Sequence, residues 1–206
     1  MLKIEDVSIA FGKEILFEKL NFQMDSGELI CISGESGKGK TSLLKAIMGF
    51  VPIQDGRILF DDILLTAETA DIIRKKIAWM PQELALPAEW VKDMIKIPFD
   101  LKVNRKVPFA RECLMHYFEM LGLDEDLYDK RVTEISGGQR QRIMLAVSAM
   151  LGRPLLMVDE PTSALDGVSC NRVLDFFHLL KSHNTAILAV SHDRKFIEGC
   201  DRKITI

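Results

Sequence analysis

The sequence predicts an α/β protein with a mostly parallel sheet, an antiparallel β part at its N-terminus and an α-helical segment inserted in the middle. Three compact apolar segments, Glu28–Ser33, Leu155–Val158 and Ile187–Val190, are typical of strands buried on both faces of a parallel sheet. Segments with the apolar spacing of helices alternate with them. Between about residues 88 and 151 the pattern is helical, which predicts a single inserted lobe.

The elements before this lobe follow from short-range patterns. Alternating apolar residues predict strands over 2–11 and 14–24 around a turn, and a second hairpin over 57–60 and 63–65. Apolar residues at helix spacing predict a helix over 40–48 that stops at Gly49 and Pro52. A helix near 68–76 and a strand over 77–80 are expected to lead into the lobe.

In the lobe, the best helical pattern spans 108–121, where Phe109, Cys113, Tyr117 and Met120 or Leu121 recur on one face. After Pro154 we expect helices over 168–182 and 193–199 and a final strand over 203–206. The chain is thus predicted to be a single domain, 1–206, with a core from 1–85 and 152–206 and a helical subdomain at 86–151.

Composition narrows the class of protein. At 48% hydrophobic and 28% charged residues, the chain resembles a folded globular domain rather than a disordered one. A formal net charge of -3 gives no reason to expect a nucleic-acid partner. The four cysteines are far apart and form no metal-binding pattern, which favours a reducing compartment. No apolar run approaches the roughly 18 residues that span a bilayer, so we expect a cytoplasmic chain that reaches a membrane through a partner.

A glycine-rich loop follows the strand at 28–33. Its sequence fits the pattern G-x4-G-K-[ST], and its residues are Gly34, Glu35, Ser36, Gly37, Lys38, Gly39, Lys40, Thr41 and the following Ser42. The glycines allow backbone N–H groups to point at phosphate oxygens, and the next helix adds its positive N-terminal end. Lys40 is expected to reach the β and γ phosphates of ATP, and the Thr41 hydroxyl to bind Mg²⁺.

Two acids end the apolar strand at 155–158. Ligands of a parallel sheet bind beyond the carboxyl ends of its strands, so Asp159 and Glu160 should face the same crevice as the glycine-rich loop. We expect Asp159 to join the Mg²⁺ shell and Glu160 to act as the general base toward water. The alternative is a solvated acidic turn before Pro161.

A second glycine-rich segment, Ser136-Gly137-Gly138-Gln139, precedes a predicted helix over 140–151. Ser136 and Gln139 form the pattern of a capping box, which is a structural explanation. Adjacent glycines, however, weaken a helix start and open its N-terminus to an anion. Arg140 and Arg142 in this helix are interpreted as a solvated face rather than a nucleic-acid contact.

Together these motifs resemble those of the ABC ATPase family. Gln82 resembles the Q-loop glutamine, Asp166 the D-loop aspartate and His192 the switch histidine that contacts the γ phosphate. Phe11 stands where the family places an aromatic that stacks on adenine. Ordinary alternatives exist: Gln82 as a loop amide, Asp166 as a helix N-cap and His192 as a turn residue. The resemblance covers essentially the whole chain and implies a P-loop NTPase (RecA-like) core.

It also implies a function and partners. Two such cassettes would close head to tail, each ATP lying between one subunit's phosphate loop and the other's Ser136–Gln139 edge, with Gln82 and Asp166 contributing. We expect an ATP-hydrolysing subunit, a homodimer, that binds transmembrane permease subunits on the inner face of the cell membrane. The alternative is an ABC ATPase of a non-transport cell-envelope complex. The stretch Trp90–Phe99 and the compact ending suggest iron or other metal efflux as the substrate class.

Overall fold

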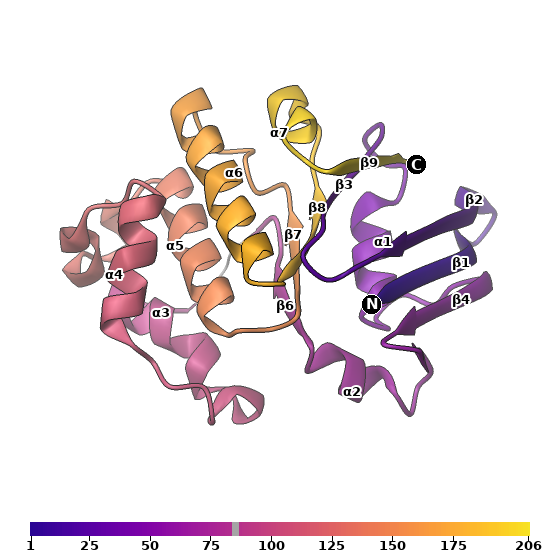
Figure 1. The fold of residues 1–206 in the computed structure, drawn as a ribbon, viewed down its shortest axis with the longest axis horizontal. Coiled ribbons are helices and arrows are strands. Elements are labelled where there is room, and N and C mark those ends of the chain that lie inside the picture. Colours follow the sequence, from indigo (N-terminus) through magenta and orange to yellow (C-terminus); the bar gives the residue numbers. More distant parts are fainter. Residues whose placement is uncertain (84–86) are drawn as a thin grey trace.

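The computed structural model describes residues 1–83 and 87–206, and in this part of the chain two sheets pack with helices into three layers (Figure 1). The parallel sheet stands in the middle. Helices α4, α5 and α6 cover one of its faces, and α1 with the antiparallel sheet covers the other. The predicted subdomain boundary at 85/86 lies outside the described residues, so it stays a prediction.

The parallel sheet confirms the central expectation. Its strand order is β6-β7-β8-β3-β9, and its strands are β6 (Ile77–Met80), β7 (Leu155–Asp159), β8 (Ala186–Val190), β3 (Leu29–Ser33) and β9 (Arg202–Thr205). All pairings are parallel. Every residue of β3, β7 and β8 is buried, as continuous apolar strands between two layers require.

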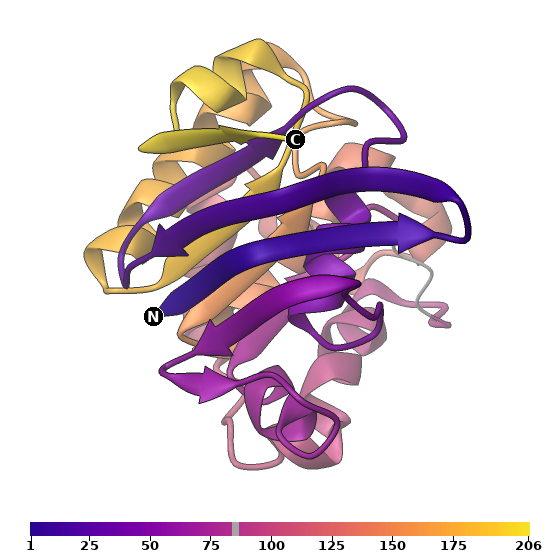
Figure 2. The same ribbon diagram turned by 90° about the vertical axis from the view of Figure 1, so that its right-hand side faces the viewer.

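The antiparallel sheet faces the viewer in Figure 2. Its strand order is β2-β1-β4-β5, with β1 (Leu2–Phe11), β2 (Glu14–Met24), β4 (Asp55–Phe60) and β5 (Ile63–Leu64). Strand β4 pairs with β1, so the two predicted hairpins share one sheet. Asp6 and Lys19 have positive φ where the register between β1 and β2 shifts, which marks β-bulges.

The helices are α1 (Lys40–Ile47), α2 (Ala70–Arg74), α3 (Val91–Asp100), α4 (Arg111–Met120), α5 (Gly137–Met150), α6 (Gly167–Ser182) and α7 (Arg194–Glu198). Short 3-10 turns η1 (Lys102–Asn104), η2 (Glu125–Asp129) and η3 (Val132–Glu134) join α3, α4 and α5. Among the described helices, none is both long and apolar enough to cross a membrane.

Two helix predictions are wrong in detail. Helix α2 is shorter than expected. The threonines before it use their side chains in a tight turn, in which Thr66 N donates to Thr69 Oγ1 at 2.8 Å. In α4 the fully buried residues are Leu114 and Phe118, one position beyond the predicted Cys113 and Tyr117. The wide apolar face of α4 packs on both α5 and α6. The spacing of its apolar residues therefore could not predict which edge of this face is more deeply buried.

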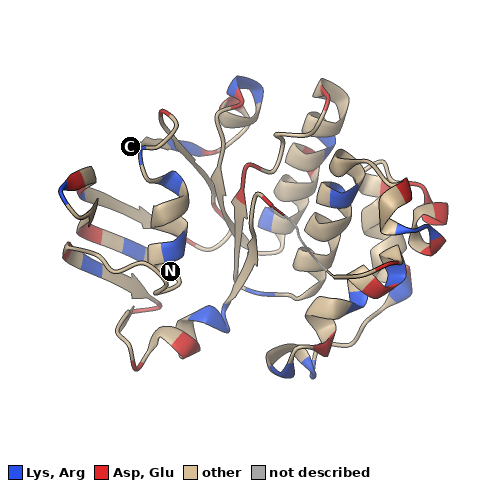
Figure 3. Ribbon diagram, turned by 180° about the vertical axis from the view of Figure 1, so that it is seen from behind, with Lys and Arg blue, Asp and Glu red and all other residues tan. Residues whose placement is uncertain are grey.

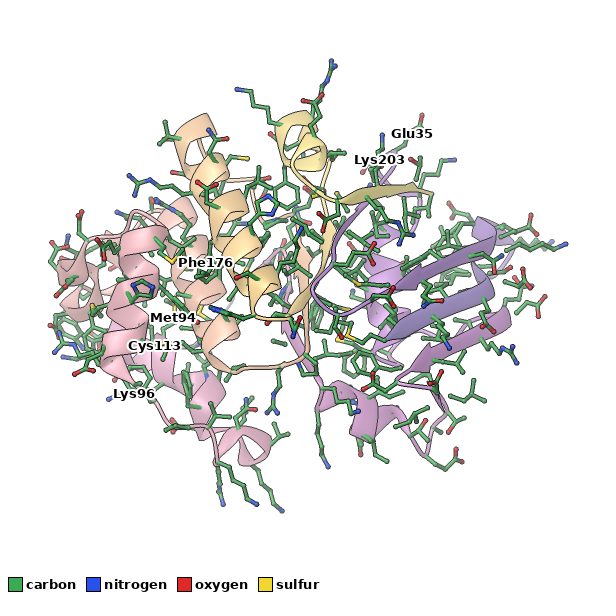
Figure 4. All side chains as sticks on the ribbon, viewed as in Figure 1. Glu35, Met94, Lys96, Cys113, Phe176 and Lys203 are labelled. Atoms are coloured by element: carbon green, nitrogen blue, oxygen red, sulfur yellow. The ribbon has the colours of Figure 1, made fainter. Side chains whose placement is uncertain are left out.

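Strands β3, β6, β7 and β8 of the parallel sheet divide their side chains between two cores. Leu29 and Cys31 of β3 pack toward the helical side, while Ile30 and Ile32 pack toward α1 and the antiparallel sheet. On the helical side Phe176 of α6 meets Tyr117 edge to face, with ring centroids 5.1 Å apart; Figure 4 labels Phe176 there, with Met94 inside the lobe and Lys96 at its margin. A sheet held from both faces fixes the carboxyl ends of its strands, where the site lies.

Candidate functional site

The glycine-rich loop joins the buried end of β3 to the start of α1. Gly37 and Gly39 have φ of 85° and 92°, and Gly39 is the residue that precedes the helix. A Cβ on Gly39 would lie 2.9 Å from Leu16 Cδ1 of β2. This position therefore demands glycine for both its conformation and its close packing, and no side chain caps the first turn of α1. The helix N-terminus is open toward the loop, as an anion site requires.

Lys40 folds back over this loop. Its Nζ donates to the carbonyl oxygens of Gly34 at 2.9 Å and Glu35 at 2.8 Å. The ammonium group is thus held above the loop by neutral carbonyls, which a phosphate oxygen can outcompete because charge-assisted hydrogen bonds are stronger.

The Thr41 hydroxyl meets the first carboxylate at the end of β7. Thr41 Oγ1 donates to Asp159 Oδ2 at 2.7 Å, and Asp159 is 2% exposed. The other oxygen, Oδ1, is buried with no hydrogen-bond partner among the described residues. Burial raises the pKa of Asp159, and the negative charge of Glu160 adds to this effect, against the Thr41 hydrogen bond.

The second carboxylate belongs to a strained turn. Glu160 has φ of 52°, a left-handed conformation that is unusual for a residue with a side chain. Its N–H donates to Val190 O at 2.9 Å, which ties the turn to β8. Its Oε2 lies 2.9 Å from His192 Nδ1 but without the alignment of a hydrogen bond. The Glu160 side chain is 10% exposed and that of His192 is 71% exposed, so the histidine covers the carboxylate from the solvent side.

One cleft of about 620 Å³ collects most of the predicted residues. It is lined by Gly34, Glu35, Ser36, Gly37, Gly39, Lys40, Thr41, Ser42, Gln82, Asp159, Glu160, Val190 and His192. Val190 was predicted only as the end of a buried strand and not as a residue of the site. Lys38 and Phe11 do not line this cleft, and Phe11 is 51% exposed at the end of β1.

The Ser136–Gln139 edge is separate from this cleft. Ser136 caps α5 with a complete capping box, in which Ser136 N donates to Gln139 Oε1 at 2.8 Å and Gln139 N donates to Ser136 Oγ at 3.1 Å. Asp166 caps α6, accepting from Ser169 N at 2.7 Å. Both structural explanations are therefore realised, and neither group contributes to the cleft of its own chain.

Packing explains the second of the two glycines at this edge. A Cβ on Gly138 would lie 2.7 Å from the carbonyl oxygen of Ala164, whereas one on Gly137 would find its nearest neighbour, Ala164 Cβ, at 4.0 Å. The first turn of α5 thus packs on the backbone of the segment that runs from Glu160 to Asp166.

The interpretation of Arg140 and Arg142 as a solvated face is wrong. Both are half-buried: Arg140 donates to Val132 O, and Arg142 donates to Leu121 O at 2.7 Å and Gly122 O at 3.1 Å. Gln141 between them is 5% exposed and was missed. The available signal was its place three residues after Gly138 and three before Met144, on the buried face of α5.

The fold and the cleft define a P-loop nucleotide-binding protein. A glycine-rich loop opens a helix beside two buried acids at the carboxyl ends of parallel strands. The family model of the ABC transporter matches residues 17–163, and the chain belongs to this family, as an ATP-binding subunit with ATPase function.

Two curated relatives of the chain are named for different transport activities. The chain is 30% identical over 211 residues to the glutamine transport ATP-binding protein GlnQ of Bacillus subtilis (strain 168), covering 100% of this chain and 86% of the relative. It is 28% identical over 207 residues to the probable iron export ATP-binding protein FetA of Escherichia coli (strain K12), covering 100% and 91%. Among solved structures, an ATP-binding cassette in a dimeric state with ADP and phosphate superposes with a TM-score of 0.84 at 24% identity, covering 100% of this chain and 94% of the other.

We expect Gly138→Ala to lower the free energy of unfolding by about 1–3 kcal/mol, because the added methyl overlaps a backbone oxygen that cannot rotate away. Urea unfolding followed by circular dichroism measures this. Gly137→Ala is the matched control, since it adds the same methyl one residue earlier, where the nearest neighbour would be Ala164 Cβ at 4.0 Å. It should leave stability unchanged or raise it by up to ~1 kcal/mol through helix propensity. Equal losses in both variants would contradict the packing explanation.

We expect Asp159→Asn to stabilise the metal-free, nucleotide-free chain at pH 7. The folded-state pKa of Asp159 is raised, so between the unfolded and folded pKa values the folded chain binds more protons, and stability falls as pH rises through that window. In urea unfolding series the advantage of the variant should be absent near pH ~4 and grow toward neutrality.

Asp166→Asn provides a control of opposite sign. The backbone N–H of Ser169 holds the pKa of Asp166 below its usual value, so this carboxylate stabilises the fold above its unfolded-state pKa. The Asp166 variant should therefore lose stability at neutral pH and match the wild type in acid. An Asp159 variant that is no more stable than the wild type at pH 7 contradicts burial as the dominant effect.

Proposed function

We propose that the chain hydrolyses ATP in the cleft of Glu160 and so powers a transporter whose membrane domains are separate polypeptides. The observation that carries this proposal is the buried carboxylate pair, with one acid bonded to the phosphate loop and the other beside His192. A solvated acidic turn, the alternative explanation of these two residues, would leave both carboxylates exposed. Lys40 would exchange its two carbonyl partners for the β and γ phosphates.

The donors at the end of β7 fit Mg²⁺. Asp159 Oδ1 is buried and has no hydrogen-bond partner within residues 1–83 and 87–206, and Thr41 and Gln82 line the same cleft. Oxygen donors of this kind suit a hard divalent cation. Thr41, Asp159 and Gln82 would hold the ion, which when bound neutralises charge on the phosphates.

Glu160 would accept a proton from the attacking water, and the water oxygen would bond to the γ phosphorus as the bond to the leaving oxygen of ADP breaks. Its Oε2 is buried and has no hydrogen-bond partner among the residues that the structure describes, so it has the free lone pair that a base requires. His192, at 2.9 Å from that oxygen, would orient the carboxylate and contact the γ phosphate. Phe11, exposed at the tip of the β1–β2 hairpin, would stack on the adenine.

The Ser136–Gln139 edge supports a head-to-tail dimer. It is a glycine-opened helix start whose first two residues, Ser136 and Gly137, are exposed, and it does not reach the cleft of its own chain. In a homodimer it would cover the nucleotide of the second subunit, with Asp166 nearby. A similar cassette has been solved as a dimer with ADP and phosphate, which supports dimerisation.

A second cleft, of about 340 Å³, is the proposed binding place for the permease subunits, at the cytoplasmic face of the membrane. It lies between β6, α5 and η1, and its mainly apolar lining includes Trp79, whose buried Nε1 has no partner among the described residues. Leu101 and Val103 at its border are 53% and 46% exposed. Basic residues lie on this side of the molecule, at the end of α2 and around η1 (Figure 3).

The names of the relatives do not agree on one transported substrate. One is named for glutamine transport and the other for probable iron export. Metal efflux therefore stays a prediction from the sequence.

We expect Glu160→Gln to bind ATP with near-normal affinity while its kcat falls by about 10²–10⁴-fold, because the amide cannot accept the proton of water. Unable to hydrolyse ATP, this variant should accumulate as a dimer in ATP, which size-exclusion chromatography with light scattering detects. Glu18→Gln makes the same change at an exposed position of β2 and should alter neither property. Near-normal turnover by the Glu160 variant would show that another group is the base.

We expect tagged Glu160→Gln chain with ATP to recover a polytopic membrane protein from detergent-solubilised membranes of its native cell. Adding Leu101→Asp and Val103→Asp should cut this recovery by about tenfold or more, since both put charge on the apolar border. The control is Leu64→Asp, which is 45% exposed on β5 and does not line the cleft. Recovery of soluble chains alone would favour a non-transport assembly, and equal recovery by all variants would place the permease elsewhere.

A further inference from the structure

The buried side chain of Gln141 makes a contact that the proposed chemistry has not yet used. Its Nε2 donates to the carbonyl oxygen of Glu160 at 2.7 Å, in the interior between α5 and the turn after β7. Its Oε1 is buried without a hydrogen-bond partner among the described residues. Burying an amide with only one end satisfied is unfavourable, so packing alone does not account for glutamine at this position.

Gln141 contacts the peptide group between Glu160 and Pro161, which has only one atom that can form hydrogen bonds. The peptide bond after Glu160 leads into Pro161, so it has no N–H, and its carbonyl oxygen is its only hydrogen-bonding atom. A residue before proline is disfavoured in helical conformations, and Glu160 also has φ of 52°. The orientation of this peptide therefore depends on the donors that reach its oxygen.

In the described part of the chain three donors reach that oxygen, and two of them come from the same turn. Ser163 contributes Oγ at 3.1 Å and its N–H at 3.3 Å. Gln141 makes the shortest contact and is the donor that comes from another element. Because the carbonyl and the carboxylate belong to one residue, a rotation of this peptide moves the base relative to the phosphate loop.

We infer that Gln141 is the positioning residue of Glu160, and that it ties the Ser136–Gln139 edge of the chain to the base of the same chain. This rests on the proposed function of both sites. Gln141 lies in the first turns of the helix that Ser136 caps, and Gly138 packs on Ala164 O in the segment after Glu160. A displacement of the start of α5 when the edge meets the nucleotide of a second subunit is thereby passed to Glu160.

The test compares Gln141→Met with the wild type in steady-state ATP hydrolysis by the full chain. Methionine keeps the volume and removes the donor. We expect kcat to fall by about 10–100-fold, the loss that small misplacements of a reacting group produce. KM for ATP should stay within about threefold, and the protein concentration at half-maximal activity should not change, since neither phosphate edge is altered.

Gln141→Asn is the second variant, because it keeps a polar amide but is one carbon too short to reach Glu160 O, and the same loss of kcat is expected. Val147→Ala, which truncates a fully buried side chain on the same helix, controls for destabilisation. It should lower the midpoint of thermal unfolding and leave kcat unchanged.

Wild-type kcat in both Gln141 variants overturns the inference, as does a shift in the half-maximal protein concentration, which would place Gln141 in the dimer edge instead. A loss of kcat in Val147→Ala equal to that in Gln141→Met reduces the effect to stability and also overturns it. The proposed function fails separately, if Glu160→Gln retains turnover or the wild-type chain hydrolyses no ATP.

Discussion

The burial of two adjacent carboxylates at the end of β7 is the constraint on which the rest of the site depends. Charges that are withdrawn from water need partners. The described residues supply one hydroxyl for Asp159 and a misaligned imidazole for Glu160. Such a pair is unfavourable in an empty cleft. A bound cation would make the pair favourable. A nucleotide bound at the phosphate loop, on the other side of the cleft, would carry such a cation with it.

The fold tolerates this arrangement because both faces of β7 are covered. Leu156 and Val158 pack toward the helical side, and Leu155 and Met157 toward α1 and the antiparallel sheet. The strand cannot move to relieve the charges at its end. Rigid burial of this kind keeps the oxygens of Asp159 and Glu160 in place before any ligand binds, which reduces the reorganisation that binding and reaction require.

Most of the cleft could be predicted from the sequence, because its residues belong to contiguous motifs whose spacing fixes their geometry. The loop at 34–42 and the acids at 159 and 160 follow directly from strand ends in a parallel sheet. Gln141 could not be assigned a role in this way, since its partner is a carbonyl oxygen, and a backbone atom leaves no trace in the residue types. Arg140 and Arg142 were misjudged for the same reason: charged side chains that satisfy helix and loop carbonyls resemble a solvated face in a linear pattern.

The same carbonyl contacts explain how one chain can carry two phosphate edges without two independent sites. The edge at Ser136–Gln139 and the acid at Glu160 are 20 or more residues apart, yet Gly138 and Gln141 of α5 both contact the turn that holds the acid. A side chain at position 138 would push α5 away from this turn. An apolar residue at position 141 would leave the Glu160 carbonyl oxygen bonded only to Ser163 of the same turn. The glycine and the glutamine are thus required by the turn after β7 as much as by α5 itself, and together they join the start of α5 to the turn that carries Glu160.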